Sequence, residues 1–334
     1  MSHDAPPRPP GLTRVDGRWL HQDGEPVDTD TLARLKRLAI PPAWTHVWAD
    51  PDPDAALQAV GVDAKGRTQY RYHPKTVADR ARDKFEHVGR FADALPRLRA
   101  AAETGLAAPG LGRDRVLAAA VRLLERGFFR VGNEEYARDN HTYGLTTLQR
   151  TQVRVHGDAL AFDYTAKEHL HRVVEVRDPQ AAAVVRALLR RQDESTVLLA
   201  WTADRARWVH VTSAYVNAYV HSVVGIDASA KSFRTWAGTV LAAAALGGAD
   251  TVGLARPNAR SAETAAVQAT ATLLGNTPSV ARASYIHPAV PSAAKRGRTV
   301  RDEVHAAAHR VGSDRLADVW TDPGLQSAVR HLLT

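Results

Sequence analysis

The chain has 334 residues, a formal net charge of +8, no cysteine and 44% apolar residues. This length predicts one large domain with a smaller appended domain, and the positive charge favours a polyanionic partner, most commonly nucleic acid. The lack of cysteine excludes disulfides, thiolate metal sites and a cysteine nucleophile. Because the chain start has no apolar signal-peptide core and no later apolar run is long enough to span a membrane, we expect a cytosolic protein.

The first part of the chain has the pattern of a small β domain. Residues 1–11, which include four prolines among the first ten positions, are expected to form a disordered tail. Short segments of β character follow at Thr13–Leu20, Thr45–Trp48 and Gln69–Tyr72. One helix is predicted over Thr29–Leu38. We therefore expect a largely antiparallel β domain over residues 12–80.

From His73-Pro74 onward the apolar spacing becomes helical. The predicted helices are Arg113–Arg126, Pro179–Arg190, His210–Val223, Ala230–Leu246, Ala262–Leu274 and Val300–Val311. An alternating polar stretch over 151–176, with a turn at His156-Gly157-Asp158, predicts a small sheet within this region. The expected fold class is α+β: a small antiparallel β N-terminal domain, then a larger, mainly α-helical domain over 81–334 that contains a small β-hairpin sheet.

Common nucleotide and metal motifs are incomplete. The stretch 61–68 has Arg67 where a Walker A loop needs lysine and leads into a strand, so ATP use is not expected. The series Asp50-Pro-Asp52-Pro-Asp54 lacks the glycine and distal glutamate of a calcium loop and is interpreted as a stiff turn. His169 and His171 lie two apart on a predicted strand without further ligands, which favours a phosphate contact or a surface role. We expect no metal and no cofactor.

Without metal or ATP, phosphoryl chemistry needs a protein nucleophile, cations for the developing charge and an acid for the leaving oxygen. The stretch 274–288 ends one helix at Gly275 and restarts another with Thr277 as its cap. This pattern delivers Asn276 from a helix junction and Tyr285 from the end of a short helix. Upstream, Arg130 and Arg234 each lie near a predicted helix start, where anions are favoured.

Two series of motifs, each in a fixed order along the chain, point to one protein family. The first part contains Ile40-Pro-Pro-Ala-Trp44, Trp48, Pro51-Asp-Pro53, Leu57-Gln58 and Gly66-Arg-Thr-Gln-Tyr-Arg-Tyr-His73. The second part contains blocks around Arg130, Lys167, Arg234 and Asn276–Tyr285. In this order, from about Ile40 to Val290, the chain resembles the bacterial and poxvirus-like type IB DNA topoisomerases.

The resemblance implies a catalytic set. Tyr285 would attack a phosphodiester and leave a 3′-phosphotyrosyl link with a free 5′-hydroxyl. Arg130 and Arg234 would hold the non-bridging oxygens, to which Asn276 would add one hydrogen bond. Lys167 would protonate the departing 5′-oxygen. The resemblance thus implies relaxation of supercoiled DNA without ATP or metal, by cleavage, swivelling and religation.

The chain departs from the family pattern at two places. The hairpin sequence Asp163-Tyr-Thr-Ala-Lys167-Glu-His169 replaces the usual Gly-Lys-Ser-Gly-Lys type, although Lys167 remains. Asn276 stands where the larger viral-type pattern has histidine, so this side chain donates a hydrogen bond but does not titrate.

The resemblance also implies contacts to duplex DNA. Gln69, Tyr70 and Tyr72 would reach the major groove, and phosphate contacts would come from Arg67, Arg71, Lys75 and His169. The expected protein is a monomeric clamp around DNA in the cytoplasm, associated with the nucleoid, with no membrane or nucleotide partner.

The sequence also allows other interpretations of these residues and of the function. Taken alone, Tyr285 is a partly buried aromatic, and Arg130 is a surface cation paired with Glu134 or Glu135. A tyrosine recombinase shares the catalytic fold, although Lys231 stands where its first histidine belongs. A third possibility is a DNA-binding clamp that has lost catalysis.

Overall fold

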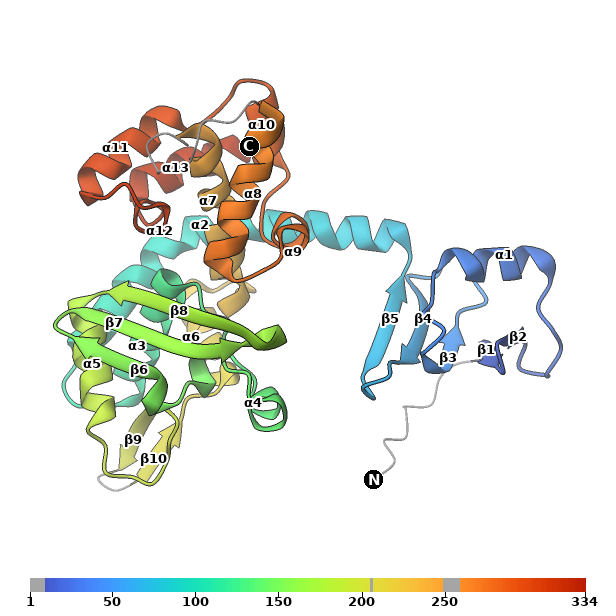
Figure 1. Ribbon diagram of the computed structural model, residues 1–334, viewed down its shortest axis with the longest axis horizontal. Helices are drawn as coiled ribbons and strands as arrows, with labels where there is room; N and C mark the ends of the chain where they lie inside the picture. Colours follow the sequence, from blue (N-terminus) through green and yellow to red (C-terminus); the bar gives the residue numbers. More distant parts are fainter. Residues whose placement is uncertain (1–9, 205–206, 249–258) are drawn as a thin grey trace. The chain divides into compact units, whose positions relative to one another are not determined.

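The computed structural model describes residues 10–204, 207–248 and 259–334 (Figure 1). The chain divides into two compact units, Met1–Lys84 and Phe85–Thr334. The division falls inside helix α2 (Pro74–Ala107), at residue 84 where the sequence placed it near 80. Apart from Pro10 and Gly11, the expected tail lies outside the described residues.

The first unit is built on one antiparallel sheet with the strand order β2-β1-β3-β4-β5. Its strands are β1 (Leu12–Val15), β2 (Arg18–Leu20), β3 (Thr45–Ala49), β4 (Leu57–Val62) and β5 (Thr68–Tyr72). Helix α1 (Thr29–Arg37) is capped by Asp28, whose carboxylate accepts the amide of Thr31 at 2.9 Å. Leu35 of this helix is buried with Leu12 of the sheet. The predicted antiparallel β domain with one helix is confirmed.

Strand β4 is absent from the sequence prediction, which expected strands only on either side of it. A Cβ at Gly61 would lie 2.7 Å from Cε3 of Trp44. The glycine therefore permits close packing of an indole within a strand. The aspartate series is the predicted turn: Asp50 and Asp52 each accept the amide two residues ahead at 2.9 Å.

The second unit is mainly helical, with helix α7 at its centre, and the α+β class is confirmed. Its helices after α2 are α3 (Arg113–Gly127), α4 (Glu134–Asn140), α5 (Pro179–Leu189), α6 (Ser213–Val224), α7 (Ala230–Gly247), α8 (Ala259–Leu274), α9 (Pro278–Ser284), α10 (Ala289–Lys295), α11 (Arg301–Val311), α12 (Leu316–Val319) and α13 (Pro323–Leu332). Short 3₁₀ turns are η1 (Leu145–Thr147), η2 (Arg150–Gln152) and η3 (Lys167–His169). Within the described ranges, no helix has both the length and the apolar character that crossing a bilayer requires.

Two small sheets lie within this helical unit. The predicted sheet is present as β6 (Val153–His156), β7 (Ala159–Ala166) and β8 (Leu170–Arg177) in sequential antiparallel order. A second hairpin, β9 (Ala200–Asp204) with β10 (Arg207–His210), was not predicted. The prediction of a helix from His210 was wrong at its start, because His210 pairs with Ala200 and Thr212 caps α6.

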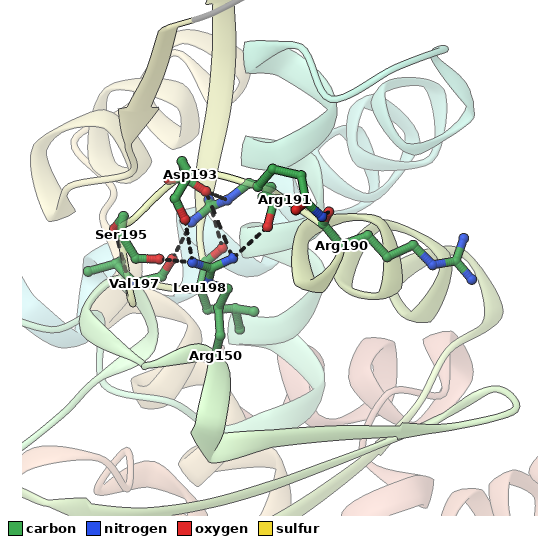
Figure 2. A network of polar contacts seen from close by, with 8 residues as sticks. Arg150, Arg190, Arg191, Asp193, Ser195, Val197 and Leu198 are labelled. Carbon is green, nitrogen blue, oxygen red and sulfur yellow. Dashed lines mark hydrogen bonds and ion pairs between the residues drawn. The ribbon is translucent and has the colours of Figure 1, made fainter.

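The loop between α5 and β9 is held by two arginines, which Figure 2 shows from close by. Arg150 donates to the carbonyl oxygens of Arg191 and Asp193 at 2.9 Å and to that of Ser195. Arg191 donates to the carboxylate of Asp193 at 3.0 Å and to the Val197 carbonyl at 2.6 Å. This network replaces the regular backbone pairing that an irregular loop lacks.

Candidate active site

The site is centred on the junction between helices α8 and α9. Gly275 has a φ of +62°, and its amide donates to the Thr272 carbonyl at 3.1 Å. The amide of Asn276 donates to the Ala271 carbonyl at 2.9 Å. These two bonds form a Schellman ending, which stops α8 and requires a left-handed residue at Gly275. The predicted junction is confirmed, with Thr277 capping α9.

Three arginines from distant parts of the chain donate to consecutive carbonyls at this junction. We call Arg130, Arg172 and Arg234 the arginine cluster. Arg172 donates to Thr272 at 2.9 Å and to Leu273 at 2.8 Å. Arg234 donates to Leu274 at 2.8 Å, and Arg130 donates to Gly275 at 2.9 Å. The last carbonyls of α8, which have no partner inside the helix, are thereby satisfied.

Among the residues that the structure describes, the arginine cluster donates only to uncharged oxygens. Arg130 also donates to Oδ1 of Asn276 at 2.6 Å, and Arg234 donates to the Phe128 carbonyl. In the part of the chain that the structure describes, no carboxylate forms an ion pair with any of the three arginines. The alternative pairing of Arg130 with Glu134 or Glu135 is therefore not observed there. Arg234 is buried, and Arg130 and Arg172 are half-buried. A buried cation without a counter-ion is costly, so this arrangement favours binding of an anion.

Tyr285 lies beside this cluster at the end of α9. Its backbone packs on α7, where a Cβ at Gly238 would lie 2.7 Å from the Tyr285 carbonyl oxygen. The Thr239 hydroxyl lies 3.3 Å from the same oxygen and accepts the His287 amide at 3.2 Å. The ring is half-buried, and Cζ of Arg234 lies 5.0 Å from its centroid. The packing therefore fixes the phenol next to a guanidinium.

Charge and burial act in opposite directions on this pair. Burial raises the pKa of Tyr285, but Arg234, with Arg130 and Lys231, outweighs it, so the pKa lies below its ordinary value. Burial lowers the pKa of Arg234 to about 10, which still leaves it cationic at neutral pH. The site thus stabilises a phenolate, the nucleophilic form of tyrosine.

Two buried donors at the site have no acceptor among the described residues. They are Nε of Arg234 and Nδ2 of Asn276. A buried donor without an acceptor costs about 1–3 kcal/mol. An oxygen acceptor that reached both atoms would remove this cost.

The structure brings together four of the five residues predicted to be catalytic: Arg130, Arg234, Asn276 and Tyr285. Lys167 is apart from them. Its exposed side chain lies in the turn between β7 and β8 and makes no hydrogen bond or ion pair with any residue in 10–204, 207–248 or 259–334.

The expectation that His169 lies on a strand facing the same side as His171 was wrong. His169 belongs to the same turn as Lys167 and has a φ of +55°, and strand β8 begins only at Leu170. His171 lies on the strand, with Nε2 2.6 Å from the Asp163 carboxylate.

The residues predicted to bind DNA in the first unit lie on or near edge strand β5. Asp63 holds two of them: its carboxylate is 2.7 Å from Nη2 of Arg67 and accepts from Gln69 at 3.0 Å. Tyr70 and Tyr72 stack with their ring centroids 6.2 Å apart, and Tyr70 is 51% exposed.

The other two residues predicted to contact DNA in the first unit, Arg71 and Lys75, differ in whether their side chains are free to bind phosphate. Arg71 donates to the Ala39 carbonyl at 2.9 Å and lies over Trp44, so its guanidinium is used within the domain. Lys75 is exposed in the first turn of α2. Across the described ranges, no group of three or more histidine, aspartate or glutamate side chains is placed to hold a metal ion.

Sequence reasoning missed Arg172, Tyr164 and Lys231 as members of this site. Tyr164 is buried, and burial raises its pKa while Arg172 opposes that rise. Lys231 is exposed at the start of α7 and contributes to the lowered pKa of Tyr285. Tyr164 and Arg172 both lie within the stretch 151–176 that was predicted to form a small sheet, but nothing in the sequence marks them as members of the site.

The chain is similar to known DNA topoisomerases. Residues 73–309 match the family model described as eukaryotic DNA topoisomerase I, catalytic core, and residues 18–63 match that of bacterial DNA topoisomerase IB, N-terminal domain. A similar protein is the DNA topoisomerase 1B of Acanthamoeba polyphaga mimivirus, 27% identical over 220 residues. This match covers 65% of the chain and 66% of the viral protein, just under two thirds of the latter.

Proposed function

The chain belongs to the type IB DNA topoisomerases, and from this premise we propose that it relaxes supercoiled DNA by cutting and resealing one strand through a temporary bond to Tyr285. The substrate is duplex DNA, and the protein acts as a monomer. No ATP takes part, because the tyrosine–phosphate bond retains the energy of the broken phosphodiester for resealing. No metal ion takes part either, because Arg130 and Arg234 supply the positive charge at the phosphate.

The observation that carries this proposal is the uncompensated arginine cluster beside a half-buried phenol. A phosphodiester held between Tyr285, Arg130 and Arg234 would supply the missing negative charge. Its non-bridging oxygens would also accept from the buried donors of Arg234 and Asn276 that lack acceptors among the described residues. A ligand of this shape therefore satisfies both the charge and the hydrogen bonds of the site.

In the cleavage step, the Tyr285 hydroxyl loses its proton to water and its oxygen bonds to phosphorus, while the bond from phosphorus to the 5′-oxygen breaks. The guanidinium groups of Arg130 and Arg234 stabilise the charge that grows on the non-bridging oxygens. Lys167 donates a proton to the departing 5′-oxygen, so the products are a 3′-phosphotyrosyl link and a 5′-hydroxyl. Resealing reverses each step, with the 5′-oxygen as nucleophile and Tyr285 as leaving group.

We assign further DNA contacts to β5 and its flanks and to the lysine hairpin. Asp63 orients Arg67 and Gln69 at the start of β5, and Tyr70 presents an exposed ring. Lys75 and His169 are exposed cationic or polar groups suited to phosphate. Arg71 supports the DNA-binding strand by packing within the domain, through its contacts to Ala39 and Trp44.

The test is relaxation of supercoiled plasmid by the purified full-length chain in EDTA without nucleotide. We expect relaxed topoisomers from the wild type and none from Tyr285→Phe. On a nicked suicide oligonucleotide, the wild type should form a covalent adduct, whereas Tyr285→Phe should bind DNA within about threefold of the wild-type Kd and form none. Absence of relaxation would sink the proposal, and strand exchange between two defined sites would favour a recombinase instead.

A further inference from the structure

We propose that Arg172 is a positioning residue for strand cleavage, which fixes the turn that carries Asn276 and ties it to the hairpin that carries Lys167. The inference rests on the proposed function. It adds a residue that touches neither the phosphate nor the nucleophile in that scheme.

The first support is the pair of hydrogen bonds that Arg172 donates to the end of α8. Its two terminal nitrogens bind successive carbonyls, those of Thr272 at 2.9 Å and Leu273 at 2.8 Å. A guanidinium is suited to this contact because its donors are held in a rigid fork. The cation also lies at the negative end of the helix dipole. Arg172 therefore fixes both the position and the direction of the last turn before Gly275.

The second support is the fit between Arg172 and Gly275. A Cβ on Gly275 would lie 2.6 Å from Nη1 of Arg172 and 3.0 Å from its Cζ. Glycine is therefore required here for two reasons. It adopts the φ of +62°, and it leaves room for the guanidinium against the turn. Asn276 follows directly, so its side chain starts from a backbone that Arg172 contacts on one side.

The third support is the rigid base from which Arg172 extends. It lies on β8 opposite Tyr164 of β7, in the same hairpin as Lys167. Tyr164 is buried and stacks with Phe129 at a centroid distance of 5.8 Å, immediately before Arg130 in the chain. Arg172 thus joins the hairpin, the Arg130 segment and the α8–α9 junction.

If Arg172 is a positioning residue, its removal should lower the rate of cleavage but change the stability of the fold little. Misplacement of a reacting or stabilising group by about 1 Å can cost about 100-fold in rate. Arg172, Thr272 and Leu273 also line a cavity of about 670 Å³, so water can solvate the carbonyls that truncation would free. We therefore expect Arg172→Ala to fold.

The main experiment measures single-turnover adduct formation on a suicide oligonucleotide with saturating protein. Arg172→Ala should slow cleavage by about 10- to 100-fold, while the Kd for DNA stays within about twofold of wild type. Arg172→Lys, which keeps one flexible donor group, should recover part of the rate. The matched control is Arg177→Ala on the same strand, since among the described residues the Arg177 guanidinium pairs with the exposed Glu175 alone. It should cleave at the wild-type rate.

A double-mutant cycle separates positioning from general destabilisation. If Arg172 acts through Asn276, the Arg172→Ala, Asn276→Ala double variant should be little slower than the slower single variant. If the two single-variant rate losses multiply in the double variant, Arg172 does not act through Asn276 and the positioning role is overturned.

A second pair of variants displaces Arg172 without removing it. Gly275→Ala should slow cleavage, whereas Gly157→Ala should not, although that glycine also has a positive φ, +55°, because a Cβ there meets nothing within 4 Å. Amide hydrogen exchange over residues 275–285 should quicken in Arg172→Ala and Gly275→Ala relative to their controls.

The outcomes separate the two proposals. If the wild type forms the adduct while Arg172→Ala matches Arg177→Ala in both rate and exchange, the positioning role is overturned and the proposed function stands. If the wild type forms no adduct, the proposed function and the role of Arg172 in cleavage both fall.

Discussion

At Tyr285 a half-buried phenol keeps a pKa below its ordinary value because the arginine beside it outweighs the effect of burial. We expect tyrosinate absorbance to show one residue, missing in Tyr285→Phe, that titrates below the ordinary tyrosine value of about 10. Below this pKa the phenol is neutral, and above it the phenolate is present. Arg130→Ala should move the titration to higher pH, because one cation is lost. Titration at or above pH 10 in the wild type would contradict the assignment.

Lys167 carries the acid role in the proposed cleavage step although it stands apart from the other catalytic residues. Lys167→Ala should slow cleavage of an ordinary phosphodiester by about 100- to 10,000-fold. On DNA with a 5′-bridging sulfur at the scissile position, the loss should be under about tenfold, because a thiolate leaves without a proton. The comparison is made by single-turnover adduct formation on both substrates. Equal slowing on the two would remove Lys167 from the acid role.

At the scale of elements, the loop between α5 and β9 depends on side chains because it lacks regular backbone pairing. The side chain of Arg191 is fully buried and lies over Trp208 at 5.0 Å, whereas that of its neighbour Arg190 is exposed and extends away from the network (Figure 2). These adjacent residues therefore form a matched pair for substitution.

Arg191→Ala should lower the free energy of unfolding by about 3 kcal/mol, because it leaves the Val197 carbonyl without its partner and removes the nearer of the two cations beside the Asp193 carboxylate. Arg190→Ala should change it by less than about 0.5 kcal/mol. Urea unfolding followed by circular dichroism measures both. Equal effects would mean that the network contributes little to stability.

At the scale of the whole molecule, a net charge of +8 predicts DNA binding that weakens steeply with salt, because contacted phosphates release counter-ions. The logarithm of the association constant should fall linearly with the logarithm of the salt concentration. Lys75→Ala should reduce the magnitude of this slope by about one, as expected for one lost phosphate contact. Arg177→Ala, which loses a cation already paired with Glu175, is the control and should leave the slope unchanged. An unchanged slope in Lys75→Ala would remove it from the phosphate contacts.

Much of the fold follows from local signals. Asp28, Thr212 and Thr277 each cap a helix with their own side chain, and Pro278 occupies a first helical position. The first and last of these helix starts were predicted, because capping depends on residues within one turn. The strands β4, β9 and β10 were not, since short buried or irregular strands depend on packing against distant partners.

Local signals in the chain predict the helix starts at Thr29 and Pro278, the basic charge and the candidate nucleophile Tyr285 with its ordered neighbours. Three further facts emerge only once the chain is folded. The arginine cluster donates to backbone carbonyls, no carboxylate in the described ranges pairs with it, and Arg172 belongs to it whereas Lys167 forms no hydrogen bond or ion pair with a described residue. The physical reason is that these arginines donate to backbone carbonyls, which every residue has, so no side-chain type in the sequence marks the partner. The bonds join residues as far as 145 positions apart, and only packing of the core brings such positions together.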